Sequence, residues 1–393
     1  MLKQLEGSRA VAETVALCHP GVICAYPISP QTHIVEALDD IVRKGEIQNC
    51  DFINVESEFS AMSVAIGASA TGSRVYTATA SQGLLFMVEP VYNASGLGLP
   101  IVMTVANRAI GAPINIWNDH SDAMSQRDSG WIQLYAQDNQ SAADLHVFAF
   151  KLAEAVSLPV MVCMDGFILT HAMEQIDVPE ASQVDAFLTD FEPRQVLDVD
   201  EPVSIGAMVG PEAFTEVRYL AHTKQLETLE LIPQLADEFE KAFGRRAAGA
   251  FDSQGLLTKY HSDDAETIVV ALGATIGTIQ DVVDEMREAG FSVGALGITS
   301  FRPFPFIAIA DALKNAKRIV VLERALAVGL GGIVEAEIRT ALVGLNIQQF
   351  TVIAGLGGRP ITKDSVREMI SRATDGSLEP LTFLDLKTEV LPR

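Results

Sequence analysis

The 393-residue sequence is poor in cysteine, and the spacing of its cysteines excludes two kinds of metal site. Only four are present, and none forms the C-x-x-C pair that is typical of iron–sulfur clusters and structural zinc sites. These residues are Cys18, Cys24, Cys50 and Cys163. All four lie in or beside apolar stretches, which favours buried free thiols in a reducing compartment. Any metal–sulfur cluster that this protein uses must therefore be carried by another chain.

Basic residues are also scarce, with 28 lysines and arginines against 51 acidic residues and a formal net charge of −23. This balance argues against nucleic-acid binding, because phosphate contacts need a basic surface. It also argues against this chain being the docking face for an acidic electron carrier. Acidic surfaces are otherwise common in soluble proteins, so the charge supports no further conclusion.

Long apolar runs are missing. The strongest candidate for a membrane span, residues 97–116, is interrupted by Pro100, Asn107, Arg108 and Pro113. The N-terminus carries charged residues and no long apolar stretch, so no secretory signal is expected. We therefore expect a cytoplasmic protein that neither spans nor binds a membrane.

Several catalytic and nucleotide-binding patterns are absent as well. The seven histidines show no H-E-x-x-H or H-x-x-E-H spacing, and no G-x-S-x-G string occurs, which excludes metalloprotease and serine hydrolase motifs. We expect no metal on this chain. The glycine-rich strings at 329–332 and 355–358 do not match G-x-G-x-x-G, so they indicate tight turns.

Apolar strand candidates alternate with helix-like stretches through the first 170 residues. The expected strands are 21–28, 52–56, 74–80, 100–108 and 159–165, and the expected helices are 11–18, 34–42, 58–70, 83–94 and 142–155. Continuous apolar strands that alternate with helices predict a parallel sheet covered on both faces.

The amino-acid composition changes after the first α/β unit. Residues 174–201 contain nine acids, one arginine and two prolines, which predicts an extended acidic crossing segment. An amphipathic stretch over 215–243 predicts a helical arm. A second α/β unit follows, with expected strands at 267–273, 292–299, 318–323 and 350–355 and expected helices at 278–289, 306–313, 333–342 and 365–372. We predict two doubly wound parallel-sheet domains, residues 1–245 and 246–393.

Polar motifs follow four strands of the first domain, where ligands bind in open parallel sheets. The loop YPISP at 26–30 is stiffened by prolines and presents Ser29, a hydroxyl suited to a carboxylate or carbonyl; the alternative is an ordinary proline turn. The string ESE at 56–58 places two carboxylates at a strand-to-helix junction, where they also suit a helix N-terminus.

The other two motifs are SQGL at 81–84 and NRA at 107–109. The first is a loop of small polar residues, and a generic strand-to-helix loop explains it equally well. Arg108 ends an apolar strand, where burial without an anionic partner is costly. Its planar fork suits a substrate carboxylate, and the alternative is an internal salt bridge.

Taken in order, these motifs, with WND at 117–119, QRDSGW at 126–131 and RPFP at 302–305, resemble the α subunit of multi-subunit pyruvate:ferredoxin oxidoreductases. The resemblance covers nearly the whole chain. It implies a thiamine-diphosphate pyrimidine-binding-like first domain and a second domain like the C-terminal domain of transketolase. The G-D-G…Asn motif that holds the diphosphate is missing here.

The resemblance also implies the reaction and the partners. The complex would oxidatively and reversibly convert pyruvate and coenzyme A to acetyl-CoA and CO₂ and pass electrons to ferredoxin through another subunit. The β, γ and δ subunits would carry Mg²⁺ and the [4Fe-4S] clusters, so this chain alone would be inactive. Two alternatives stay open: the same chemistry on another 2-oxo acid (2-oxoglutarate, a branched-chain 2-oxo acid or oxalate), and a non-catalytic scaffold or binding protein.

Site roles are implied by the same resemblance. Glu58 would hydrogen-bond N1′ of the cofactor's pyrimidine and favour the imino tautomer that removes the C2 proton. Spacing does not separate it from Glu56, because alternation in an extended segment puts both on one face. Arg108 would bind the substrate carboxylate with help from Ser29, a hydroxyl where many relatives have threonine. The implied cofactor-binding residues besides Glu58 are Tyr26, Pro27, Ser81 and Gln82.

Overall fold

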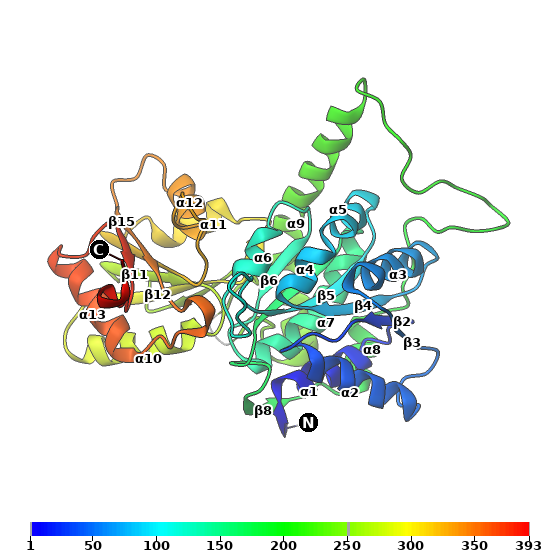
Figure 1. Ribbon diagram of the computed structural model, residues 1–393, viewed down its shortest axis with the longest axis horizontal. Coiled ribbons are helices and arrows are strands. Elements are labelled where there is room, and N and C mark those ends of the chain that lie inside the picture. The colour runs from blue at the N-terminus through cyan, green and yellow to red at the C-terminus, as the bar shows by residue number, and fades with distance from the viewer. Residues whose placement is uncertain (1, 250–251, 393) are drawn as a thin grey trace.

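A computed structural model describes residues 2–249 and 252–392 and contains two seven-stranded sheets that lie side by side (Figure 1). In spatial order the first sheet consists of β13 (Ser300–Arg302), β6 (Ile132–Tyr135), β7 (Val160–Asp165), β5 (Ile101–Asn107), β4 (Val75–Thr79), β2 (Val22–Ala25) and β3 (Asp51–Asn54). All of these strands are parallel except β13, which pairs antiparallel with β6. Every residue of β2, β4, β5 and β7 is buried, as expected for strands covered on both faces.

The helices of this half are α1 (Gly7–Leu17), α2 (Thr32–Arg43), α3 (Glu58–Ala70), α4 (Ser81–Phe86), α5 (Val88–Leu97), α6 (Ser121–Ser125) and α7 (Asn139–Val156). α3 and α7 contact the sheet, and α1 and α9 (Phe214–Phe243) in turn contact α7. This second layer explains why α7 is buried on most of its surface. The single helix expected at 83–94 is two helices, because the chain turns at Met87 between α4 and α5.

The second sheet consists of β16 (Leu381–Phe383), β15 (Gln348–Ile353), β14 (Arg318–Glu323), β11 (Thr267–Ala271), β12 (Val293–Ile298), β10 (Leu257–Tyr260) and β9 (Asp252–Ser253). Five of its strands are parallel, while β10 and β9 extend one edge antiparallel. Its helices are α10 (Thr275–Glu288), α11 (Phe306–Leu313), α12 (Val334–Ala341) and α13 (Lys363–Asp375), with short 3₁₀ turns η1 (Leu356–Gly358) and η2 (Thr388–Val390). The two parallel sheets confirm the predicted fold class.

The acidic segment 174–201 is not extended throughout, which corrects the sequence prediction for part of it. It begins in β8 (Met173–Asp177), which pairs antiparallel with β1 (Leu2–Glu6), and then forms α8 (Ala181–Phe187). α8 exists because Phe187 packs its ring edge-on against Phe239 of α9, a contact between residues far apart in the sequence. Composition alone does not reveal such a partner.

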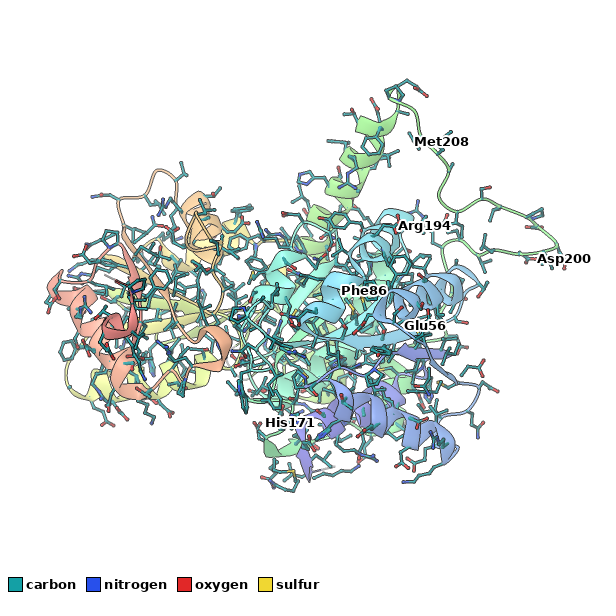
Figure 2. The ribbon with its side chains drawn as sticks, in the orientation of Figure 1. Glu56, Phe86, His171, Arg194, Asp200 and Met208 are labelled. Carbon is teal, nitrogen blue, oxygen red and sulfur yellow. The ribbon has the colours of Figure 1, made fainter. Side chains whose placement is uncertain are left out.

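The stretch expected as a helical arm is α9, and it ends at Gly244 in the left-handed conformation, as glycine allows. The C-terminal half of α9 is buried against the body, while its first turns and much of the loop before it project from the body (Figure 1). In between, Gln225 Nε2 donates to the carbonyl of Gly130 in the body. Figure 2 marks this loop with Arg194, Asp200 and Met208. Because β13 lies in the first sheet although it follows residue 245, the boundary between two domains at that residue stays a prediction.

The cysteines are free thiols, as expected: Cys18, Cys24 and Cys163 are buried and Cys50 is half-buried. Burial raises the pKa of Cys50 to about 11, so this thiol is protonated and unreactive near neutral pH. No helix in the described part of the chain is long and apolar enough to cross a bilayer.

Candidate active site

Four of the sequence motifs converge at one edge of the first sheet. The loops that follow β2, β3, β4 and β5 leave neighbouring parallel strands at their carboxyl ends. This edge is where open α/β sheets bind ligands. The structure thus brings together Ser29, Glu58, Ser81 and Arg108, which the sequence places tens of residues apart.

The two acidic residues at 56 and 58 lie in different environments. Ser57 caps α3, and its side chain accepts a hydrogen bond from the backbone N–H of Ser60 at 3.2 Å. Glu58 is therefore the first helical residue, and its side chain is 7% exposed. Glu56 is exposed and accepts a hydrogen bond from the Ser60 hydroxyl (Figure 2). The helix start separates two carboxylates that simple alternation had placed on one face.

The carboxylate of Glu58 lies against the start of α4. A Cβ atom placed on Gly83 would come within 2.6 Å of a Glu58 carboxylate oxygen and of the Thr79 hydroxyl, so only glycine leaves room for both. Neither group has a hydrogen-bond partner within the residues that the structure describes. A buried carboxylate beside a buried unpaired hydroxyl is costly unless a ligand supplies the missing partners.

Arg108 is 6% exposed at the end of β5. Its Nε donates to the carbonyl of Asn115 at 3.0 Å, and one terminal nitrogen donates to the carbonyl of Ser29 at 2.9 Å. The guanidinium forms no ion pair with any described carboxylate, so the internal salt bridge considered as an alternative is absent. Burial lowers the pKa of Arg108, partly offset by the charge of Asp122. The site holds a buried cation that lacks a contacting anion.

Asp122 was not singled out by the sequence analysis, yet it connects two of the predicted loops. It is fully buried and accepts hydrogen bonds from the backbone N–H groups of Ser81 and Arg108, each at 2.9 Å. It also accepts from Asn107 Nδ2 at 2.9 Å. Burial raises the pKa of Asp122 to about 6, although the hydrogen bonds oppose that shift. Asp122 stands in a polar stretch of the sequence, and nothing in that stretch indicates that its side chain is buried.

Ser81 closes the connection between the loops after β4 and β5. Its backbone has a positive φ of 48°, which is strained for a residue with a side chain. Its hydroxyl donates to the carbonyl of Ala109 at 2.5 Å, and its N–H is held by Asp122. Gln82 points at Gly111, where an added Cβ would lie 2.6 Å from Gln82 Nε2. These contacts hold the loop after β4 against the loop that carries Arg108.

The remaining predicted residues lie at the rim. Tyr26 and Pro27 are exposed, and Ser29 is exposed with its carbonyl turned toward Arg108. Within the described chain, no hydrogen bond joins the Tyr26 side chain to the other predicted residues. The structure therefore places these three in the same loop as expected but does not enclose them.

A second cluster, also missed from sequence, joins the two sheets. Asp165 at the end of β7 contacts His120 Nε2 at 2.7 Å, a terminal nitrogen of Arg324 at 3.1 Å and the backbone N–H of Ala274 at 2.7 Å. Arg324 also donates to Asn118. Burial alone would raise the pKa of Asp165, but Arg324 and His120 hold it well below its usual value. This buried network fixes the loop after β5 against the second half of the chain.

A cavity of about 350 Å³ lies elsewhere, between the loop after α6, the exposed part of α9 and the start of α11. Its lining includes Trp131, His222 and Phe304 and none of the predicted site residues.

Two regions of the chain match known family descriptions. Residues 13–237 match pyruvate flavodoxin/ferredoxin oxidoreductase, thiamine-diphosphate binding, and residues 265–366 match pyruvate:ferredoxin oxidoreductase core domain II. Among curated relatives, a pyruvate synthase subunit PorA from Methanosarcina barkeri is 45% identical over 98% of this chain and 97% of the relative. The ketoisovalerate oxidoreductase subunit VorA of Pyrococcus abyssi is 38% identical over 93% of this chain and 91% of the relative.

Solved structures agree on the fold. A 2-oxoglutarate:ferredoxin oxidoreductase from Magnetococcus marinus superposes with a TM-score of 0.70 at 19% identity, and the match spans 95% of this chain and 65% of that one. A split-gene transketolase superposes with a TM-score of 0.55 at 12% identity, over 95% and 99% of the two chains. With the sequence matches across both sheets, these findings show that the chain belongs to the pyruvate:ferredoxin oxidoreductase family, as an α subunit.

Proposed function

We propose that this chain supplies the pyrimidine-side half of a thiamine-diphosphate site in an enzyme that oxidises pyruvate. The overall reaction consumes pyruvate, coenzyme A and two oxidised ferredoxins, and yields acetyl-CoA, CO₂, two reduced ferredoxins and a proton. The observation that carries the proposal is Arg108, a buried guanidinium whose described partners are neutral carbonyls. The names of the relatives at 40–45% identity support pyruvate as the substrate.

The residues around Glu58 suit the pyrimidine end of the cofactor. A buried carboxylate without a partner is a strong acceptor for a protonated ring nitrogen, and Gly83 keeps the space beside it open. When bound, thiamine diphosphate supplies the nucleophilic carbon that adds to the 2-oxo group. Glu58 would hold the proton at N1′, and its burial limits the access of water to that contact.

Arg108 would then orient the substrate. Its backbone is fixed by Asp122, and Asn115 and Ser29 hold the side chain through their carbonyls. A two-pronged contact with the pyruvate carboxylate would give the buried charge its anion. The Ser29 hydroxyl is exposed in the loop after β2, whose Ser29 carbonyl contacts Arg108, and from there it can donate to the substrate.

Changing Arg108 to lysine is expected to raise the KM for pyruvate in the assembled enzyme by about 10- to 100-fold, with coenzyme A dependence changed less. Lysine keeps the charge and loses the planar fork, and a hydrogen bond to a charged group contributes about 1.5–3 kcal/mol. Steady-state kinetics with a viologen dye as acceptor measures this. A lowered thermal midpoint with unchanged KM would instead assign Arg108 a structural role.

The diphosphate, its Mg²⁺ and the [4Fe-4S] clusters are assigned to partner subunits, termed β, γ and δ. The sequence lacks a G-D-G motif and paired cysteines, which supports this assignment. Ferredoxin would dock on another subunit, because this chain is strongly acidic.

The isolated chain, supplied with thiamine diphosphate, Mg²⁺, pyruvate and coenzyme A, is expected to reduce no viologen dye. The same assay on the reconstituted complex is expected to show pyruvate-dependent reduction. Activity of the isolated chain would contradict the division of the site between subunits.

The alternative is that the complex acts on a different 2-oxo acid. The similarity to the ketoisovalerate subunit keeps this alternative open. Comparing kcat/KM of the complex for pyruvate, 2-oxoisovalerate and 2-oxoglutarate decides between them. A preference for either larger acid would overturn pyruvate while keeping the role of this chain.

A further inference from the structure

Three residues with metal-binding side chains meet in the first domain. Glu6 ends β1, His33 lies in the first turn of α2, and His171, labelled in Figure 2, lies in the loop between β7 and β8. One ligand atom from each lies within 4.8 Å of the other two. The sequence separates these residues widely, which is why no metal-ligand spacing was visible.

The chemistry of this set is selective. Two imidazoles and one carboxylate are typical ligands of Zn²⁺ and related transition-metal ions, whereas Mg²⁺ and Ca²⁺ prefer oxygen ligands. Glu6 and His33 already share a hydrogen bond of 2.6 Å, and their side chains are 29% and 46% exposed. Tetrahedral Zn²⁺ with bonds of about 2.0–2.1 Å needs ligand atoms slightly farther apart than the two atoms of that hydrogen bond, which a small side-chain movement provides.

A hydrogen bond with the neighbouring threonine orients His171. Its Nδ1 lies 2.7 Å from the hydroxyl of the buried Thr170, and that hydroxyl also accepts from the backbone N–H of Phe167 at 2.8 Å. If His171 donates from Nδ1, Nε2 keeps a free lone pair, the arrangement usual for metal-binding histidines.

The cluster is also connected to the candidate active site. The rings of His33 and His171 lie 4.5 Å apart, and His171 and Phe167 are 4.8 Å apart. Phe167 in turn packs on Trp117 at 4.8 Å, in the loop that carries Asn115, the partner of Arg108. The same turn approaches the proline loop, since a Cβ on Gly166 would lie 2.5 Å from the ring of Pro30.

We propose that Glu6, His33 and His171 bind one divalent transition-metal ion, for which Zn²⁺ is the best match, with water in the fourth position. The ion joins β1, the start of α2 and the loop after β7. Backbone hydrogen bonds from Gly7 to Ala172 and from Ser8 to Thr170 already hold the end of β1 against that loop, so the ion adds a link to α2 through His33. It is distinct from the Mg²⁺ assigned to a partner subunit.

Titration of the tag-free, chelator-treated full chain with ZnCl₂ in a calorimeter tests this. We expect one Zn²⁺ per chain and a higher midpoint of thermal unfolding with the metal than without it. His33→Gln and His171→Gln are each expected to weaken binding at least about tenfold. Titration with MgCl₂ is expected to give no comparable binding.

His19 provides the matched control. It pairs with Asp185 at 2.8 Å on the same domain, and among the described residues it belongs to no group of three possible metal ligands. His19→Asn should therefore bind Zn²⁺ like the unchanged chain, whereas equal losses in all three variants would overturn the assignment. Co²⁺ supplies a readout that needs no variant: the unchanged chain should develop the visible absorption of a four-coordinate N/O site. Absence of that band, or of any Zn²⁺ binding, overturns the proposal.

Discussion

Replacing Glu58 by glutamine is expected to lower turnover of the assembled enzyme by about 10²–10⁴-fold, the usual contribution of a positioned acid or base. An amide cannot stabilise a protonated N1′ as a carboxylate does, because it carries no negative charge. The fold should persist, since Glu58 makes no hydrogen bond to the described protein and glutamine has nearly the same shape. Turnover at saturating pyruvate and circular dichroism of the variant measure the two effects.

Glu56→Gln is the matched control, two residues away on the same loop. Glu56 is exposed, and the hydrogen bond from Ser60 lowers its pKa, so its loss should affect only the start of α3. Turnover should stay near normal. A large loss in Glu56→Gln together with normal turnover in Glu58→Gln would show that the other carboxylate serves the cofactor.

Replacing Asp165 by asparagine is expected to lower the free energy of unfolding by about 3–5 kcal/mol, because it leaves the buried Arg324 without its anion. The network also holds His120 and the N-terminus of α10, so the two halves of the chain should separate more easily. Urea unfolding of the full chain near neutral pH measures the change. Glu266→Gln breaks an exposed pair with Lys317 and should cost less than about 1 kcal/mol.

The effect of Asp165→Asn should depend on pH in a defined direction. Burial would raise the pKa of Asp165, but Arg324 and His120 hold it well below its ordinary value of 3.8. The stabilisation is therefore complete above the unfolded pKa and is lost as pH falls toward the folded pKa. The difference between the variant and the unchanged chain should be constant above about pH 5 and shrink below pH 4. A difference that grows on acidification would contradict this account.

Much of the architecture was predictable because it rests on local patterns. β14 (Arg318–Glu323), α3 (Glu58–Ala70) and α11 (Phe306–Leu313) have the bounds that hydrophobic patterning predicted. Each is an apolar run or an amphipathic stretch that ends at a polar or turn-forming residue. β1, β8 and β13 were missed because they are short and only partly apolar, and each is a strand only through pairing with a distant segment.

Some features of the candidate site were likewise predictable from local sequence, and others depend on segments that are distant in the sequence. Arg108 was predictable as a charged residue that ends an apolar strand, and its need for an anion follows from desolvation. That no described carboxylate pairs with its guanidinium was not predictable, because this depends on which side chains the loops bring near. Asp122 and the choice of Glu58 over Glu56 likewise depend on burial, which single-sequence patterns leave open.

By itself, the sequence determined the fold class, the absence of cluster-binding cysteine pairs and the ordered motifs that resemble one enzyme family, since each depends on residue types and short spacings. Only the tertiary structure decided which carboxylate is buried, that Asp165 and Arg324 join the two halves, and that Glu6, His33 and His171 meet. Burial and proximity arise when loops from distant segments pack on one sheet, and the free energy of a charge depends on those neighbours far more than on its own identity.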